Sequence, residues 1–382
     1  MAVELGNDST CNSSSEYKHT TYAVVYSLVF IFGLLGNGSA LYVFCKLSIK
    51  NRLSTIILIN LAVSDLIFIL ALPLRIGYYM RELWSQSGGG GSGSGGSTGL
   101  RPHTEREVDV LDLACRVSTY LFYISMYCSI YFLMALSVCR YLVLSGRLRH
   151  QNRVYCRRVR LLCAGIWTFV VTINVAYVAA MDGFRVKASG CFEPSGADTW
   201  NFLYRVNTLA VVVGLSLPLV LVLACYALMI RHVLAARAGR RMRDVVLICL
   251  VLTVFCLCFL PYHVQRTLHL AYSREPAPCE SRVQLERSVV ATLCLAVANS
   301  VLDPLIFLFV GNGFLQAVRK TLAAAVTGGH WPWGKGNGFS SSSRGTTSSP
   351  TPPSPHAQQL LVFVQPPSPK QDRGDDGDST AL

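Results

Sequence analysis

Two arginines lie in or beside long apolar stretches of this 382-residue chain, where a charged side chain is costly unless it serves a purpose. Arg75 follows Asp65 by ten residues, about 15 Å at the rise of a helix. Arg266 comes three residues after His263. A guanidinium group presents a planar fork of donors that matches a carboxylate or a phosphate. The two arginines therefore predict a binding site for an anionic ligand.

Aromatic residues recur near both arginines. The candidates for ligand contact are Tyr26, Tyr120, Tyr123, Tyr127, Tyr262 and His263. Three of them, Tyr120, Tyr123 and Tyr127, are spaced i, i+3 and i+7, which places them along one face of a helix. Tyrosine combines apolar area with a polar tip, so the predicted ligand also has an apolar body. Two alternatives stay open: the tyrosines pack helices together, and Arg266 extends its charge to the membrane interface.

The sequence lacks the features of several other classes of protein. It has no nucleophile–base spacing, metal-ligand motif or phosphate-binding loop, so we expect neither an enzyme nor a cofactor. A transporter usually shows internal repeats in matching halves, which the sequence does not show. A retinal-binding protein needs a lysine in its last span, and residues 289–310 contain none.

The composition is that of a membrane protein. The chain is 52% hydrophobic and 14% charged, whereas soluble domains are about 25% charged. About 20 mostly apolar residues cross a bilayer as a helix. Seven stretches qualify, at 22–44, 53–78, 114–144, 159–181, 202–230, 244–270 and 289–310. The predicted fold is an all-α membrane protein, a seven-transmembrane helix bundle with a short amphipathic helix at 314–325 after the seventh span.

Basic residues predict the orientation of the bundle. They gather in the connections after the first, third and fifth stretches, which are therefore cytoplasmic and leave the N-terminus extracellular. Glycosylation sequons at Asn7 and Asn12 agree with an outer N-terminus. The net charge of +13 follows from this topology and does not indicate nucleic-acid binding. The predicted location is the plasma membrane.

Three regions are expected along the chain. Residues 1–20 form a glycosylated extracellular segment, residues 21–325 the seven-transmembrane domain, and residues 326–382 a disordered cytoplasmic tail. Residues 87–112 read as a flexible insertion in the first outer loop, because they begin with a Gly/Ser tract. A linker, a natural insertion and a gene-model error would look alike there. The last residues, Thr380-Ala381-Leu382, fit a ligand of a PDZ domain.

Each predicted span carries its own motif. The motifs are Gly36-Asn37, Leu61-Ala62-Val63-Ser64-Asp65, Cys139-Arg140-Tyr141, Trp167, Pro218 with Tyr226, Phe259-Leu260-Pro261-Tyr262-His263, and Asn299 with Asp303-Pro304-Leu305-Ile306-Phe307. In this order they resemble the motifs of the rhodopsin-like G-protein-coupled receptors, over residues 22–325. The resemblance implies a receptor that binds a heterotrimeric G protein and, as a further partner, arrestin.

The resemblance also implies a polar site in mid-membrane. Asp65 and Asp303 are expected to converge with three more residues on a water-filled site that holds a sodium ion in the resting state. The three are Asn37, Ser129 and Asn299. The plainer alternative is a buried hydrogen-bond network without an ion.

Four cysteines fall on the predicted outer side, where oxidation is expected and three pairings can form. They are Cys11, Cys115, Cys191 and Cys279. The family pattern pairs Cys115 with Cys191, which leaves Cys11 to pair with Cys279.

At the cytoplasmic end, the resemblance assigns contact with the G protein to Arg140, together with Tyr141 and Tyr226. The chain departs from the common pattern here, because Cys139 stands where an acid usually precedes the arginine. Arg241, near the inner end of the sixth span, is basic as well. Neither usual carboxylate partner is present to hold Arg140 in the resting state.

Within the family, the outer halves of several spans are most similar to the cysteinyl leukotriene receptors. The segments that carry this similarity are Pro73-Leu74-Arg75, Cys115–Tyr120, Cys191–Pro194, Pro261–Leu270 and Ser288–Asn299. The similarity implies a lipid-mediator ligand and coupling to the Gq class with calcium release. Nucleotide receptors of the purinergic group share a Pro-Tyr-His and an outer arginine in the sixth span, and they are the alternative.

Overall fold

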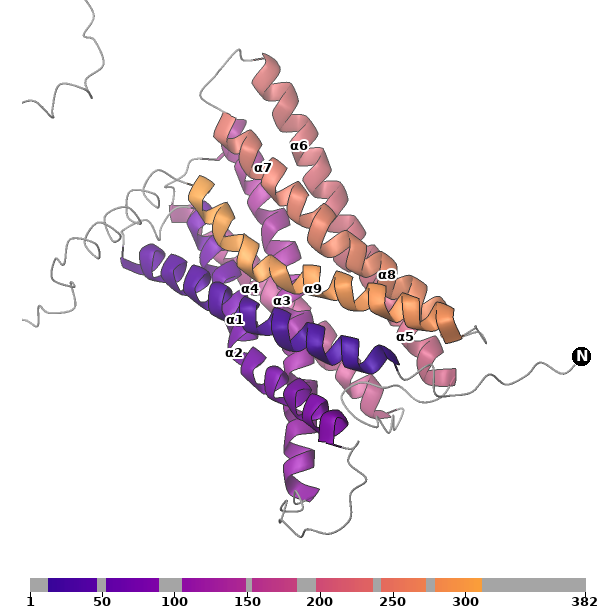
Figure 1. Ribbon diagram of the computed structural model, residues 1–382. Helices are drawn as coiled ribbons and strands as arrows, with labels where there is room; N and C mark the ends of the chain where they lie inside the picture. The colour runs from indigo at the N-terminus through magenta and orange to yellow at the C-terminus, as the bar shows by residue number, and fades with distance from the viewer. Residues whose placement is uncertain are drawn as a thin grey trace, which may run out of the picture. The chain divides into compact units, whose positions relative to one another are not determined.

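The computed structural model describes residues 13–46, 53–88, 105–148, 153–183, 197–235, 242–272 and 279–310. Its helices are α1 (Ser13–Lys46), α2 (Leu53–Gly88), α3 (Glu105–Leu144), α4 (Arg153–Gly183), α5 (Ala197–Leu209), α6 (Leu217–Ala235), α7 (Met242–Val254), α8 (Leu260–Tyr272) and α9 (Cys279–Val310), with π-helical turns η2 (Ala210–Ser216) and η4 (Phe255–Phe259) (Figure 1). Within the described ranges, seven helical segments are long and apolar enough to cross a membrane. The predicted all-α seven-transmembrane bundle is confirmed.

Two helices are longer than the apolar stretches that predict them. α2 continues to Gly88, past the expected end at Tyr78, and α3 begins at Glu105, inside the expected flexible insertion 87–112. The insertion is therefore helical at both of its ends, and its residues 89–104 lie outside the described ranges. Hydropathy underestimates both helices because a helix needs only its own backbone bonds and tolerates charges once it leaves the hydrocarbon.

The fifth and sixth spans each change from α-helix to a π-helical turn and back. The N–H of Leu217 donates to Val212 O, and the N–H of Leu260 donates to Phe255 O, five residues earlier in both cases. Each of these residues comes just before a proline, Pro218 or Pro261, which has no N–H to donate. The two turns therefore lie where the regular hydrogen-bond ladder is interrupted.

One carbonyl left without a donor near Pro218 is satisfied by a side chain from another span. In a π-helical register, the donor to Val213 O would be residue 218, a proline. The hydroxyl of Tyr131 on α3 donates to Val213 O at 3.0 Å instead. This bond fastens α3 to η2 at the level of the candidate site.

The helices pack around a shared core and turn apolar side chains outward. α1 packs against α2 and α9, and α2 packs against α3 (Figure 1). A Cβ at Gly36 would lie 2.8 Å from Pro304 Cγ, so glycine allows α1 to approach α9 this closely. On the outside, Leu35, Leu161 and Val220 are 67%, 64% and 61% exposed. Such side chains need the bilayer to cover them.

Candidate functional site

Arg75 lies on α2 within a layer of tyrosines from α1 and α2. The residue is 6% exposed, and its guanidinium carbon lies 5.1 Å from the ring centre of Tyr26 and 5.9 Å from that of Tyr79. The Tyr22 ring stacks on Tyr26 with 5.2 Å between centroids. The faces of aromatic rings attract a cation, so this layer stabilises the buried charge without neutralising it.

Hydrogen-bond donors outnumber acceptors in this layer. Nε and Nη1 of Arg75 and the hydroxyl of Tyr26 are buried, and none of these atoms has a hydrogen-bond partner among the described residues. Leaving a buried donor unpaired costs about 1–3 kcal/mol, and more for a charged group. An anionic oxygen bound here would satisfy several donors at once. The structure thus brings together two predicted site residues, and adds Tyr79, which follows Arg75 by four residues in the same helix.

Arg266 lies on α8 beside a second group of tyrosines. The hydroxyls of Tyr123 on α3 and Tyr262 on α8 are hydrogen-bonded at 3.1 Å. Arg266 lies near both of these tyrosines and near Tyr177 of α4. A hydroxyl pair beside a guanidinium group has donors and acceptors to offer, so this part of the site suits a polar group of a ligand.

The neighbours of Arg266 in the sequence hold α8 to the helices on either side. Asn207 on α5 donates from Nδ2 to Thr267 Oγ1 at 2.7 Å. Ser288 on α9 donates from Oγ to Gln265 Oε1 at 3.1 Å. Together these bonds fix how α8 is turned about its axis, and with it the direction of Arg266. Sequence reasoning missed Asn207 and Ser288, because a single polar residue in a span does not reveal its partner.

His263 makes two hydrogen bonds, one to a backbone carbonyl and one to Tyr127. Nδ1 of His263 lies 2.9 Å from Phe259 O, and Nε2 lies 3.3 Å from the hydroxyl of Tyr127. A carbonyl only accepts, so Nδ1 of the neutral imidazole must carry the proton. Nε2 then accepts from Tyr127. The pair connects α3 to the backbone of η4, the irregular turn of the sixth span.

Gly214 makes room for the Tyr127 ring. A Cβ at this position would lie 2.6 Å from Tyr127 Cε1, closer than side chains approach. Gly214 is in η2, four residues before Pro218, so the site depends on a glycine within an irregular turn. Sequence reasoning missed this residue as well, although a glycine just ahead of a proline in an apolar span was visible.

The predicted tyrosine stripe of α3 faces two neighbouring helices. Tyr123 and Tyr127 are hydrogen-bonded to residues of α8, whereas the ring of Tyr120 faces Tyr177 of α4 with 6.5 Å between ring centroids.

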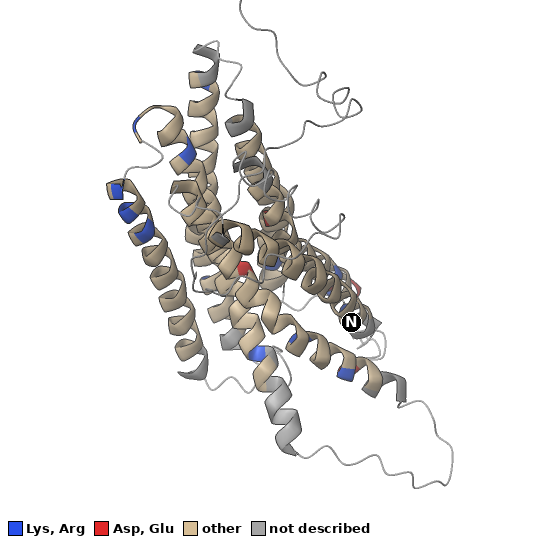
Figure 2. Cartoon of the chain, turned by 90° about the vertical axis from the view of Figure 1, so that its left-hand side faces the viewer, with Lys and Arg blue, Asp and Glu red and all other residues tan. Residues whose placement is uncertain are grey.

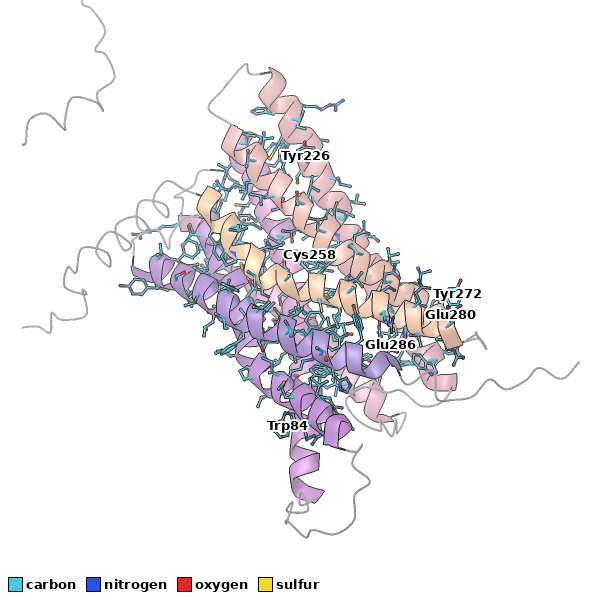
Figure 3. The ribbon with its side chains drawn as sticks, viewed as in Figure 1. Trp84, Tyr226, Cys258, Tyr272, Glu280 and Glu286 are labelled. Atoms are coloured by element: carbon cyan, nitrogen blue, oxygen red, sulfur yellow. The ribbon has the colours of Figure 1, made fainter. Side chains whose placement is uncertain are left out.

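Near the outer ends of the helices, Lys18 on α1 is 3.4 Å from the carboxylate of Glu286 on α9, a residue labelled in Figure 3. This ion pair joins the first and last spans.

The predicted mid-membrane network is present around Asp65. Asp65 Oδ1 accepts from Ser300 Oγ at 3.0 Å and from Ser129 Oγ at 3.4 Å. Asn299 Nδ2 donates to Asp303 Oδ2 at 3.0 Å, and Asn37 Nδ2 donates to Ser300 O at 2.7 Å. Ser300, which no motif singled out, is the residue that joins Asn37 to Asp65.

The oxygen atoms of this network lack donors. Oδ2 of Asp65 and Oδ1 of Asp303, Asn299 and Asn37 are buried and accept no hydrogen bond from a described N–H or hydroxyl donor, and the Asp65 and Asp303 carboxyl groups lie within hydrogen-bonding reach of each other. Four unpaired acceptor oxygens, two of them from carboxyl groups, are the kind of ligands that a hard cation takes. The residues present therefore fit a small cation such as sodium.

At the other end of the bundle, Arg140 is 7% exposed and Cys139 beside it is buried. Tyr141 is half-buried. Tyr226 on α6 accepts a weak bond from the Cys249 thiol of α7, with 3.8 Å between sulfur and oxygen (Figure 3). The predicted G-protein contacts thus come from the third and fifth spans.

Several predicted residues cannot be placed. Cys11, Cys191, Asn7, Asn12 and the final Thr380–Leu382 lie outside the described residues, as does the amphipathic helix at 314–325. Cys115 and Cys279 lie in described helices, but their side chains are outside the description. The two disulfides remain predictions.

Comparison with known proteins agrees with this architecture. The profile of the seven-transmembrane receptors of the rhodopsin family matches residues 102–307. Human cysteinyl leukotriene receptor 1 is 31% identical over 340 residues, which are 85% of this chain and 94% of that receptor. Human cysteinyl leukotriene receptor 2 is 33% identical over 331 residues, covering 83% and 86% of the two chains. Human lysophosphatidic acid receptor 6 is 28% identical over 324 residues, covering 82% and 87%.

The close approach at Gly214 yields a first prediction. Gly214→Ala should lower thermal stability by about 1–3 kcal/mol, because the added methyl group must displace the Tyr127 ring. Thermal unfolding of the purified protein measures this. Gly165→Ala is the matched control, since a Cβ there meets nothing within 4 Å. Adding Tyr127→Leu to Gly214→Ala should recover part of the loss. Equal melting temperatures for the two alanine variants would contradict the steric argument.

Proposed function

The chain belongs to the rhodopsin family of seven-transmembrane receptors, and we propose that its ligand is a cysteinyl leukotriene. The family membership makes it a multi-pass protein of the plasma membrane that binds a small molecule and acts on a G protein. Two of the similar human receptors are named for cysteinyl leukotrienes, and a third is named for another lipid mediator.

The observation that carries the proposal is the donor-rich layer at Arg75. Its unpaired Nε and Nη1 and the unpaired Tyr26 hydroxyl require an acceptor inside an otherwise apolar layer of rings. A leukotriene combines a carboxylate, a fatty-acid chain and a peptide-like cysteinyl group. We assign the carboxylate to Arg75 and the cysteinyl group to Arg266 and the hydroxyls of Tyr123 and Tyr262. The fatty-acid chain of the ligand then lies along the tyrosine rings.

A nucleotide is the alternative ligand, because a guanidinium fork also matches a phosphate. The surroundings of Arg75 favour the lipid. Tyr22, Tyr26 and Tyr79 surround Arg75 with aromatic rings. A nucleoside triphosphate carries about four negative charges, more than Arg75 and Arg266 together compensate.

Calcium responses to cysteinyl leukotrienes and to uracil nucleotides, measured in parallel in cells expressing the chain, test the ligand. We expect submicromolar responses to the leukotrienes, which correspond to a binding free energy stronger than about −8 kcal/mol, and none to the nucleotides. A response to uracil nucleotides alone would reject the ligand and leave the family intact. Calcium release would also support coupling to the Gq class.

Substitution of Arg75 tests whether this residue binds the carboxylate of the ligand. Arg75→Ala should weaken leukotriene potency about ten- to a hundredfold, because charge-assisted hydrogen bonds contribute about 1.5–3 kcal/mol. Arg75→Lys should recover only part, since an ammonium group cannot make the bidentate contact. Arg81→Ala is the matched control, because Arg81 lies on the same helix but pairs with Glu82 at 3.1 Å. Unchanged potency in a normally expressed Arg75→Ala receptor would show that Arg75 is structural.

For the G-protein side, we propose that Arg140 contacts the G protein, with Tyr141 and Tyr226 nearby, and that Cys139 leaves the resting state weakly held. A thiol is neutral at cytosolic pH and cannot pair with the guanidinium group of Arg140 as a carboxylate does. A shift of about 1.4 kcal/mol changes the ratio of active to resting receptors tenfold. Arrestin is expected to bind the same cytoplasmic side.

Cys139→Asp should therefore lower ligand-free signalling at matched surface expression. Arg140→Ala should abolish coupling while ligand binding is kept, which separates the two ends of the receptor. Basal inositol phosphate accumulation and radioligand binding measure the two effects. If Cys139→Asp leaves basal signalling where it was, the acid normally found at this position is not what holds the resting state.

We further propose that Asp65 and Asp303 hold a sodium ion, with oxygens of Asn37, Ser129 and Asn299 nearby. The unpaired oxygens of the network support this, because a bound cation supplies the positive charge that they lack. Sodium chloride should then raise the melting temperature more than potassium chloride at equal ionic strength, since a ligand of the folded state stabilises it. Asp65→Asn should remove the difference. Identical melting temperatures of the unmodified receptor in the two salts would favour the network without an ion.

A further inference from the structure

The first two turns of α4 carry four arginines, Arg153, Arg157, Arg158 and Arg160, which together form the α4 arginine face. All four are exposed. They fall within eight residues, and no acidic residue occurs in α4 before Asp182 at its far end. Figure 2 shows a group of basic residues at one end of this helix, with other basic residues on the remaining helices.

The α4 arginine face turns toward lipid. Leu161 follows Arg157 by four residues and Arg158 by three, so the three side chains share one side of the helix. Leu161 is 64% exposed, and the side that packs on the bundle is marked instead by buried Cys156 and Val159. The exposed line continues through Phe169 and Ile173, which are apolar. The arginines therefore lie at one end of the stripe that the bilayer covers.

The length of the apolar part sets the depth of the arginines. Residues 161–180 contain no charged side chain, and these 20 residues rise about 30 Å, the thickness of the hydrocarbon core. Arg160 immediately precedes this segment, and Arg157 and Arg158 lie within one turn of it. This places the α4 arginine face in the headgroup layer. The positive-inside distribution makes this the cytoplasmic leaflet.

Within the part of the chain that the structure describes, no carboxylate compensates three of these charges. Arg153, Arg157 and Arg158 form no ion pair with a described acidic residue, unlike Lys18 with Glu286 and Arg81 with Glu82. Arg158 lies over the Tyr155 ring, with its guanidinium carbon 5.8 Å from the ring centre. The ring steadies this side chain at the helix surface and leaves the edge of its fork of donors available.

We propose that the α4 arginine face binds the headgroup of a phosphoinositide in the cytoplasmic leaflet. Guanidinium groups match phosphate oxygens in bidentate geometry. A headgroup with several phosphates fits four arginines within two turns better than a headgroup with a single negative charge. Clusters of this size next to a transmembrane helix recognise such lipids. The acyl chains of the bound lipid lie along Leu161, Phe169 and Ile173.

A G protein is the other partner that a basic cytoplasmic surface could serve. The direction of Arg157 and Arg158 favours the lipid, because both flank the line of Leu161 on the side turned away from the helix bundle. Arg140, in contrast, is buried among the helices. A partner that binds between the helices would not reach side chains that point into the surrounding leaflet.

The test uses the purified full-length chain in phosphatidylcholine nanodiscs that contain a photoactivatable phosphatidylinositol 4,5-bisphosphate. Crosslinks should map to the first turns of α4. The Arg157→Gln, Arg158→Gln double variant should need roughly thirtyfold more probe for the same labelling, from the energy that each basic residue gains near an anionic leaflet. Replacing the same two residues with lysine should restore part of the labelling, because the charge returns without the planar fork.

The control is the Arg205→Gln, Arg282→Gln double variant, which removes two exposed charges from α5 and α9 and should label normally. Equal labelling of the α4 variant and the control would overturn the proposal. So would full competition by phosphatidylserine at matched charge, whereas competition by excess soluble inositol trisphosphate is expected of a headgroup site. Loss of G-protein activation with labelling unchanged would assign the arginines to the G protein. None of these measurements uses a leukotriene, so they are independent of the proposed ligand.

Discussion

Backbone groups inside a bilayer have no water to bond with, so each must find its partner within the protein. Most of this chain meets the requirement with regular helices, and the exceptions lie next to prolines. Before Pro218 and Pro261 the helices shift to π-helical turns. The carbonyl of Val213 takes the Tyr131 hydroxyl as its donor. The candidate site is built on these interruptions, because η2 provides the space for Tyr127 and η4 provides the carbonyl that orients His263.

The same scarcity of water divides the interior of the bundle by polarity. Around Arg75 the unpaired buried atoms are donors, and around Asp65 they are acceptors. Because both residues lie on α2, ten residues apart, one helix carries unpaired donors about 15 Å from unpaired acceptors. Each unpaired buried group costs free energy, which a ligand of the matching charge would recover. The proposed anionic ligand and the proposed cation would therefore be distinguished by depth along a single helix.

The sequence predicts local properties of this fold well and contacts between helices poorly. Seven spans follow from hydropathy, which depends on each residue alone, and the Asp65 network follows from motifs that mark depth. The pairs Tyr127–Gly214 and Asn207–Thr267 could not be predicted, because they depend on how one helix is turned against another. Pro218 and Pro261 indicate that the backbone hydrogen-bond ladder of the helix is interrupted, yet they do not indicate whether the helix bends or gains a π-helical turn. The extension of α2 and α3 beyond the apolar stretches was missed because hydropathy shows which residues lie in the hydrocarbon core and not where the helix that contains them ends.

The hydrogen bond from His263 to the carbonyl of its own preceding turn ties the imidazole ring to the backbone of the sixth span. The ring cannot rotate without losing its hydrogen bond to Phe259 O, and Phe259 is the last residue of the π-helical turn η4. A ligand atom that draws the Tyr127 hydroxyl away leaves Nε2 without its donor and favours a new ring orientation. The polarity of the ligand at this one point, separately from its size, then bears on a ring that is bonded to the backbone of the sixth span. Two compounds of identical shape that differ in polarity here would hold that ring differently.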